Sequence, residues 1–417
     1  MKLLQRAFLL RRRWDRGIAW LGAAGLPLRH GITIGAASFF ALVGLYLIAL
    51  RPRSRRLIAG SFLLLSVSYF FYSLALALFR GEPVIDNRQL SYSLIIGLLA
   101  FIANGMVLVR DPLRCFVIGA RAGTVVCAAI ALLASNSELD RFGMGGNPAP
   151  FAMLAAFALV AAIIPIANAP RWAPNSLIYV LVGGISVFAS QTRAVLMVLP
   201  VILAVESIIW LRGRSFRLQL TGYVAGAAAL GLAVSVGPIH TMLAERFVPI
   251  VQYYSGDHAA WDGSATADLR FAMWKGFAHA FVESPIIGHG SDRMERVVAL
   301  APTLNAELRE FQHIHNIVLD ELLQHGILGL LILAGVIVSG AAYAIRHADS
   351  NALKRNIAYA LLVLVVYGMF HNPMLHESTI AAVFFYLGVT IAHGMRCQAM
   401  ARRRMDGPVL LFGTRAA

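Results

Sequence analysis

Long apolar runs separated by short polar connections extend along the chain from one end to the other. The runs are continuously apolar and do not alternate with polar residues, which favours membrane-spanning helices over barrel strands. Segments of membrane length lie at about 15–29, 32–50, 57–79, 90–109, 113–134, 150–168, 175–190, 194–211, 218–238, 317–345, 356–371 and 379–396. The pattern predicts an all-α polytopic membrane protein with about twelve transmembrane helices.

The basic residues support an even number of spans. They gather at both chain ends and in every second connection, at 11–13, 51–56, 110–114, 171, 212–217, 346–355 and 402–404. Because lysine and arginine are retained on the cytoplasmic side, we expect both termini in the cytoplasm. The basic N-terminal segment has no small-residue cleavage pattern, so we interpret it as a retained end and not as a signal peptide.

Composition agrees with this class. The chain has 417 residues, of which 59% are hydrophobic and 14% charged, whereas a soluble protein carries about a quarter charged residues. The net charge of +15 follows from the basic connections, so no nucleic-acid partner is predicted. Cys115, Cys127 and Cys397 have no paired spacing, which predicts neither a disulfide framework nor a zinc site.

One polar segment is much longer than the others. It covers 239–316 and falls on the outer face, where we expect a structured helical loop domain. The chain then divides into a transmembrane bundle (1–238), this loop domain, a second group of transmembrane helices (317–396) and a cytoplasmic tail (397–417).

Helical spacing of apolar residues appears inside this loop. It predicts an amphipathic helix over 266–284, which Pro285 ends. Shorter helices are expected at 291–300 and 305–311.

Two arginines on the outer face are candidates for binding an anion. Arg193 lies between two spans, and Arg270 lies on the predicted loop helix with Trp274 one turn later. A guanidinium at a low-dielectric surface pairs bidentately with phosphate. An interfacial anchor for Arg193 and a solvated helix face for Arg270 are the alternatives. Arg80 and Arg88, on another outer loop, would add to the same positive field.

Two histidines stand directly before the apolar run that begins at 317. A neutral imidazole is the commonest general base near pH 7, which makes His315 the first candidate and His313 the second. Helical spacing places Gly326 under His315, where it would let a neighbouring helix approach. Asp320 and Glu321 are expected either to orient the ring or to form a buried ion pair. No third ligand stands at a fixed spacing, so no metal is predicted.

Arginines suited to a diphosphate and a histidine suited to accepting a hydroxyl proton fit one reaction class. That class is transfer of a group from a lipid-linked diphosphate to an alcohol. The leaving group departs already charged and needs electrostatic stabilisation more than it needs protonation.

Three motifs in this order resemble the O-antigen ligase superfamily. They are Ser190-Gln191-Thr192-Arg193-Ala194; Leu269-Arg270-Phe271-Ala272-Met273-Trp274 with Ser284-Pro285-Ile286-Ile287-Gly288-His289-Gly290; and His313-Ile314-His315-Asn316 with Gly326-Ile327-Leu328-Gly329-Leu330. The resemblance covers about 150–345 by motif. In the arginine motif, Met197 stands where the family pattern has leucine.

The resemblance implies a GT-C-like glycosyltransferase of the bacterial inner membrane with a periplasmic active site. It would transfer a glycan from undecaprenyl diphosphate to a sugar hydroxyl of lipid A-core, with inversion, and without metal, ATP or another cofactor. Carried over residue by residue, Arg193 and Arg270 would hold the diphosphate and His315, or His313, would activate the acceptor. The supporting residues would be Arg80, Arg88, Trp274, Asn316 and Gly326.

Three alternatives remain at this point. Polysaccharide polymerases and protein O-oligosaccharyltransferases of the same superfamily share the donor and differ only in the acceptor. A transporter of lipid-linked oligosaccharide would need charged groups along a path at mid-membrane. The predicted spans are poor in charge, with Arg121 the clearest exception, which favours an enzyme.

Overall fold

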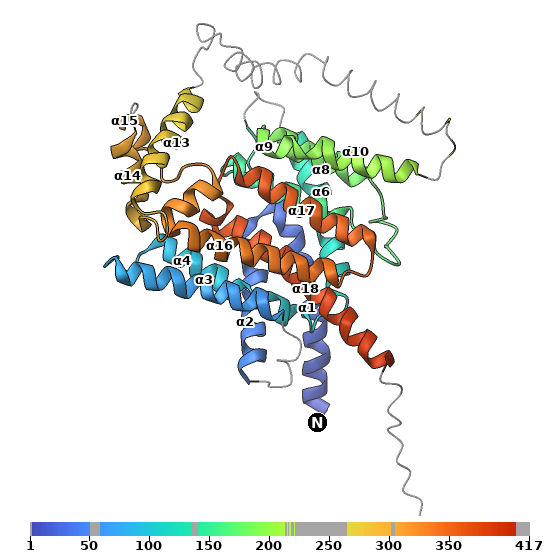
Figure 1. The fold of residues 1–417 in the computed structure, drawn as a ribbon. Coiled ribbons are helices and arrows are strands. Elements are labelled where there is room, and N and C mark those ends of the chain that lie inside the picture. The colour runs from blue at the N-terminus through green and yellow to red at the C-terminus, as the bar shows by residue number, and fades with distance from the viewer. Residues whose placement is uncertain are drawn as a thin grey trace, which may run out of the picture.

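The described part of the chain is built from helices (Figure 1). The structure, a computed structural model, describes residues 2–50, 59–134, 141–212, 265–301 and 305–405, together with 215, 217 and 221. The elements are α1 Lys2–Leu28, α2 His30–Leu50, α3 Gly60–Phe79, α4 Arg88–Leu99, α5 Ile102–Met106, α6 Pro112–Ala134, α7 Pro148–Ala162, α8 Ile178–Ala189, α9 Arg193–Leu196, α10 Val198–Leu211, α13 Ala265–Glu283, η2 Gly290–Asp292, α14 Arg293–Leu300, α15 Asn305–Leu308, α16 Ile317–Arg346, α17 Asn351–Gly368, η3 Pro373–Leu375 and α18 Glu377–Met405.

A helix overlaps each predicted span that the structure describes, although α7 ends at Ala162, before the predicted limit of 168. Nearly all of the predicted span 218–238 lies outside the described residues. Seven described stretches are long and apolar enough to cross a membrane: His30–Leu50, Gly60–Phe79, Arg88–Met106, Pro112–Ala134, Arg193–Leu211, Ile317–Arg346 and Glu377–Ala401. The apolar helices α7 and α8 are shorter. This agrees with a polytopic α-helical membrane protein, and the count of twelve spans stays a prediction.

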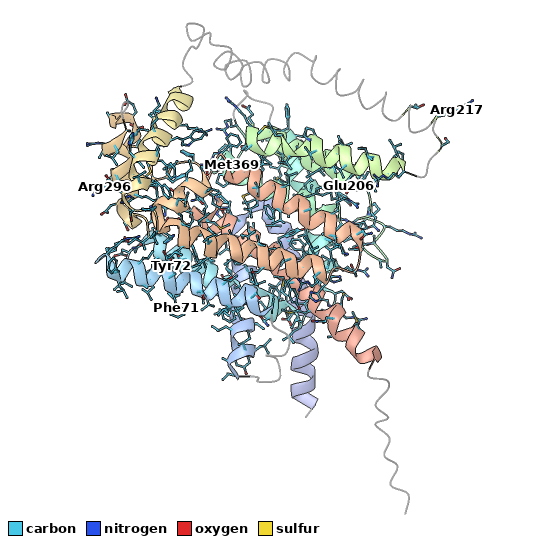
Figure 2. The ribbon with its side chains drawn as sticks, viewed as in Figure 1. Phe71, Tyr72, Glu206, Arg217, Arg296 and Met369 are labelled. Atoms are coloured by element: carbon cyan, nitrogen blue, oxygen red, sulfur yellow. The ribbon has the colours of Figure 1, made fainter. Side chains whose placement is uncertain are left out.

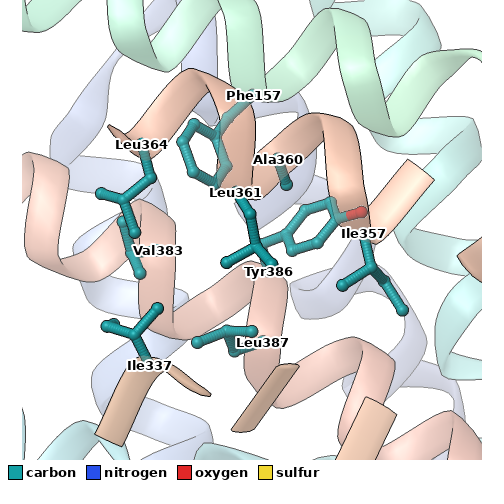
Figure 3. A pocket seen from close by; sticks show the side chains of 9 residues that line it. All are labelled: Phe157, Ile337, Ile357, Ala360, Leu361, Leu364, Val383, Tyr386 and Leu387. Atoms are coloured by element: carbon teal, nitrogen blue, oxygen red, sulfur yellow. The ribbon is translucent and has the colours of Figure 1, made fainter. Parts of the chain in front are cut away.

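Helix α18 forms the centre of the bundle. It packs against α2, α4, α5, α6, α7 and α16, and 89% of its apolar stretch is buried. Figure 3 shows the space between α7, α16, α17 and α18, a cavity of only about 10 Å³ lined by Phe157, Ile337, Ile357, Ala360, Leu361, Leu364, Val383, Tyr386 and Leu387. The Tyr386 hydroxyl donates to Asn356 Oδ1 at 2.5 Å. The bundle is therefore closely packed at this point.

Arg121, on α6, is buried in the bundle, and its hydrogen bonds connect α6 to the end of α7 and the segment after it. Its guanidinium donates to the carbonyl oxygens of Ala162, Ile164 and Ala173 and to Asn175 Oδ1, each at 2.8 Å. The last carbonyls of a helix have no partner within the helix. Arg121 supplies one at the end of α7, so this charge in the spans has a structural use.

The described part of the segment predicted to be the outer loop forms a small helical unit at one end of the bundle, which we call the outer unit (Figure 1). The helix expected at 266–284 is confirmed as α13, and α14 and α15 lie within the two shorter predictions. The unit has its own apolar core, which includes Met273, Val297, Leu308, Ile314 and Leu323. Since the last two belong to the histidine segment and to α16, this core attaches the outer unit to the membrane helix. Residues 239–264 lie outside the described part of the chain.

Candidate active site

A buried ion pair holds the segment that carries the two histidines. Arg293 and Asp320 are 1% and 0% exposed, and the arginine Nε donates to the carboxylate Oδ1 at 3.1 Å. The same oxygen accepts a hydrogen bond from the backbone N–H of Ile314 at 3.4 Å. Arg293 also donates to the carbonyl oxygen of Gln312 at 3.4 Å. The backbone on both sides of His313 is therefore fixed from inside the protein.

A second loop joins the same carboxylate. Asn372, in the connection between α17 and α18, donates to the other oxygen of Asp320 at 2.8 Å. Asn316 caps α16 by accepting from the N–H groups of Val318 and Leu319, and it donates to the Met369 carbonyl oxygen at 3.2 Å. Figure 2 shows Met369 at the end of α17 that faces the outer helices. These bonds bring the loop after α17 to the histidine segment.

Asp320 and Glu321 have separate roles. Asp320 fixes the backbone before His315 and forms the buried ion pair that was one of its two expected roles. Glu321 accepts from the Tyr69 hydroxyl at 3.0 Å and lies 2.8 Å from His325 Nδ1. The described contacts of Glu321 are thus with α3 and its own helix.

The two loops form a cluster of aromatic rings around His315. The ring centroid of His315 lies 4.3 Å from that of His313, 5.4 Å from that of Phe311 and 5.9 Å from that of His371. The His371 ring stacks on Tyr367 at 4.9 Å. His315 has a φ of 56°, a left-handed backbone that is costly for a non-glycine residue and that concentrates at active sites.

The histidines of the cluster are neutral at pH 7. Burial, with contributions from His313, His371 and Arg270, lowers the pKa of His315 to about 3. Burial, with contributions from Arg270 and His313, likewise lowers the pKa of His371 to about 3. Burial is also the main cause that lowers the pKa of His313 and of His376. The neutral form is the one that accepts a proton from a hydroxyl group.

Two buried polar atoms in this region have no hydrogen-bond partner among the described groups, Arg270 Nε and His315 Nδ1. Burial lowers the pKa of Arg270, and no carboxylate of the described residues opposes this effect. Arg270 is near enough to help lower the pKa of His315. A buried N–H group without an acceptor is costly, so an acceptor beside Arg270 Nε would be stabilising.

Arg193 lies on a neighbouring turn. It is half-buried at the first position of α9, after Gln191, whose φ of 52° is also left-handed. Arg141 donates to the Ser190 carbonyl oxygen at 3.3 Å and contributes to the lowered pKa of His371. The turn that carries Arg193 is thus connected to the histidine cluster through Arg141.

The expected supporting residues have different positions. Arg88 is exposed and donates to Gln312 Oε1 at 3.2 Å and to the Tyr92 hydroxyl at 2.7 Å, which places it at the edge of the cluster. Arg80 donates to the carbonyl oxygens of Ile287, Gly288 and Gln324, and it thereby supports the outer unit. Trp274 is 36% exposed on α13, one turn after Arg270.

The expected alignment of His315 with Gly326 is wrong. His315 precedes the helix cap Asn316, and Gly326 interrupts α16 with a φ of 71° and a ψ of −168°. A Cβ at Gly326 would clash with the carbonyl of Ile286, and the N–H of Ile327 donates to the Pro285 carbonyl oxygen at 2.9 Å. Gly326 does permit a close approach, but the approaching segment is the turn at 285–287 and not a helix.

Several residues of the site were not predicted. His371 and His376 come from a short loop that shows no recognisable spacing, and Arg293 and Arg141 resemble ordinary surface arginines in sequence. One feature of the sequence could have identified this loop: His371, Asn372 and His376 lie within six residues between two predicted spans. Among the described residues, one group offers three metal-ligand atoms within 4.8 Å of one another, Asp349, His393 and Cys397, at the far end of α16.

Residues 178–334 match a family model described as O-antigen ligase. The match confirms the resemblance seen in the motifs and includes Arg193, Arg270, His313 and His315. The loop with His371 lies outside the matched segment. No curated protein matches the chain.

Replacing Asp320 with asparagine should loosen both loops of the site. The change leaves the buried charge of Arg293 without its partner, which typically costs about 3–5 kcal/mol. Hydrogen–deuterium exchange should become faster at 311–316 and at 371–376. Glu295→Gln, which alters an exposed carboxylate on the helix of Arg293, is the matched control and should leave the exchange unchanged. Equal exchange in Asp320→Asn and in the wild type would contradict this role.

Acidification should destabilise the folded protein through the buried histidines of the cluster. The pKa of His315 and of His371 falls from 6.5 to about 3 on folding. The unfolded chain therefore takes up protons first as the pH drops below about 6.5, and stability is lost progressively towards about 3. The thermal unfolding temperature in detergent should be constant above about pH 7 and fall below it. His371→Asn removes one titrating group, so the unfolding temperature of this variant should fall less steeply with decreasing pH. A wild-type unfolding temperature that stays constant from about pH 7 to 5 would refute the argument.

Proposed function

We propose that this chain, whose residues 178–334 belong to the O-antigen ligase family, transfers a glycan from undecaprenyl diphosphate to a sugar hydroxyl of lipid A-core. The reaction takes place on the periplasmic face of a bacterial inner membrane. The family match implies glycosyl transfer by a ligase or a polymerase. The choice of lipid A-core as the acceptor is part of our proposal.

The pair of unsatisfied atoms, Arg270 Nε and His315 Nδ1, is the observation that supports this function most directly. One atom is a charge-assisted donor that suits a phosphate oxygen. The other belongs to a neutral imidazole that suits a hydroxyl proton. A donor diphosphate could accept from the first atom and an acceptor sugar could donate its hydroxyl proton to the second.

The transfer can be written with these groups in defined roles. The acceptor oxygen attacks the anomeric carbon of the donor glycan, and the bond between that carbon and the phosphate oxygen breaks. Arg270, with Arg193 from the turn before α9, stabilises the negative charge that develops on the departing diphosphate. His315 takes the proton of the acceptor hydroxyl. The anomeric carbon is inverted because attack and departure occur on opposite faces.

Binding of the donor would also make His315 a better base. With a pKa lowered to about 3, the free imidazole holds a proton weakly. An anion nearby favours the charged form of a base and raises its pKa. The diphosphate would therefore strengthen the base when the donor is in place, and the charge of the imidazolium would in turn stabilise the leaving group.

The packing of the bundle favours an enzyme over a transporter. Arg121, the charge that drew attention in the spans, is fully occupied by four acceptors. The cavity of Figure 3 is almost entirely apolar and too small for a sugar. The polar groups of the proposed site lie in loops between helices and on α13.

Substitution of His315 by alanine should remove transfer while leaving donor binding intact. Loss of a well-placed general base costs about 10²- to 10⁴-fold in rate. The assay uses the purified chain with lipid-linked glycan and two acceptors, lipid A-core and a second molecule of the donor, without ATP and with a chelator. Product on lipid A-core identifies a ligase, and chain extension on the donor identifies a polymerase.

His279→Ala is the matched control, because His279 is exposed on α13, and it should retain wild-type activity. An active His315→Ala variant would refute the assignment of the base. Absence of product on either acceptor, with lipid scrambling that survives loss of His315, would favour a transporter.

Arg270→Lys should restore little of the donor use that Arg270→Ala loses. Lysine keeps the charge but lacks the planar fork that binds two phosphate oxygens. We expect a reduced kcat/KM for the donor in both variants, measured by the same assay. Arg296→Lys, on the exposed face of α14 (Figure 2), is the control. Wild-type kinetics in Arg270→Lys would exclude bidentate binding.

A further inference from the structure

We propose that Asp349, His393 and Cys397 form a binding site for a divalent cation of the zinc type, at the cytoplasmic end of the bundle. Asp349 Oδ2 lies 3.0 Å from His393 Nε2, and Cys397 Sγ lies 3.6 Å from the same nitrogen. The three ligand atoms lie within 4.8 Å of one another. Ligand atoms around a tetrahedral zinc ion are about 3.3–3.8 Å apart, because the bonds are about 2.0–2.3 Å long.

The fold brings these three residues together from two elements. His393 and Cys397 are four residues apart on α18 and therefore share one face of the helix. Asp349 lies in the turn between α16 and α17. Packing fixes this turn against α18, since a Cβ on Gly394 would come within 2.9 Å of the His347 Cβ. The Tyr343 hydroxyl adds a hydrogen bond to Gln398 Oε1 at 3.4 Å.

The ligand types select the metal. A thiolate disfavours magnesium and calcium, which prefer oxygen ligands, and a set of sulfur, nitrogen and oxygen suits zinc. The Asp349 side chain is 51% exposed and that of His393 is 17% exposed, so the site is open to solvent and leaves a fourth position for water.

The metal would join the α16–α17 turn to α18. The site is separated from the histidine cluster by the length of α16, about 45 Å for 30 residues. It is therefore independent of the proposed transfer chemistry. The sequence predicted no zinc site at Cys397. His393 is of a metal-ligating residue type and lies near it in sequence, whereas Asp349 is distant along the chain.

Cobalt binding tests the proposal, because a thiolate bound to Co²⁺ gives a near-ultraviolet charge-transfer band that histidine ligands do not give. The purified full chain in detergent is treated with chelator, freed of it and titrated with Co²⁺. We expect one Co²⁺ per chain, the sulfur band, tetrahedral d–d bands, and loss of all of these on adding Zn²⁺. Zn²⁺ should also raise the thermal unfolding temperature.

Cys397→Ser should abolish the sulfur band, whereas Cys115→Ser, which changes another half-buried cysteine, should keep it. His393→Ala and Asp349→Asn should weaken Co²⁺ binding more than tenfold. An unchanged elution volume and metal-free unfolding temperature show that each variant is folded. Co²⁺ binding without the sulfur band, or a band that survives Cys397→Ser, would overturn the proposal, as would no binding at all. Glycan transfer should be unaffected by chelator and by Cys397→Ser, so the two proposals can fail separately.

Discussion

The buried carboxylate of Asp320 is the interaction on which the candidate site depends. It accepts hydrogen bonds from Arg293, from the backbone of Ile314 and from Asn372. These groups come from α14, from the segment before α16 and from the loop after α17. Because both charges of the ion pair are removed from water, neither can be lost alone without leaving the other unpaired. The pair therefore defines one arrangement of the two loops, and that arrangement places His313, His315 and His371 in contact.

The break in α16 at Gly326 divides the helix into a polar part that packs against the outer unit and an apolar part long enough to cross a membrane. The part before the break contains the buried polar residues Asp320, Glu321 and Gln324 and contributes Leu323 to the core of the outer unit. The part from 327 to 346 is apolar and about 30 Å long, which is enough to cross the hydrocarbon layer. The loop from Pro285 to Gly288 lies against the break. Helix α13 is thus joined to α16 through backbone contacts that only glycine permits.

Two arginines, the buried Arg121 and the half-buried Arg270, show how the surroundings of a side chain decide what it can bind. Arg121 donates to four acceptors at the end of α7, and its charge is spread over their dipoles. Arg270 has an unpaired Nε and lies among neutral histidines. The first arrangement is complete without a ligand, whereas the second leaves one buried guanidinium N–H without an acceptor. An anionic substrate would accept a hydrogen bond from this Nε, which explains how the site could favour a diphosphate.

The sequence by itself determined the class of the protein, the positions of its helices and the three motifs. Apolar length and helical periodicity are local properties, so α13 and most described spans could be predicted with nearly correct limits. Helix α1 begins at Lys2 and α18 continues to Met405, beyond the predicted spans 15–29 and 379–396. The motif residues Arg193, Arg270 and His315 were also recognisable, since each lies next to a span or on an amphipathic helix. Tertiary structure decided the rest. The joining of His371 to His315, the role of Asp320, the break at Gly326 and the meeting of Asp349 with His393 depend on packing between distant segments. Such contacts leave no periodic trace in a single sequence, because each partner on its own is an ordinary polar residue.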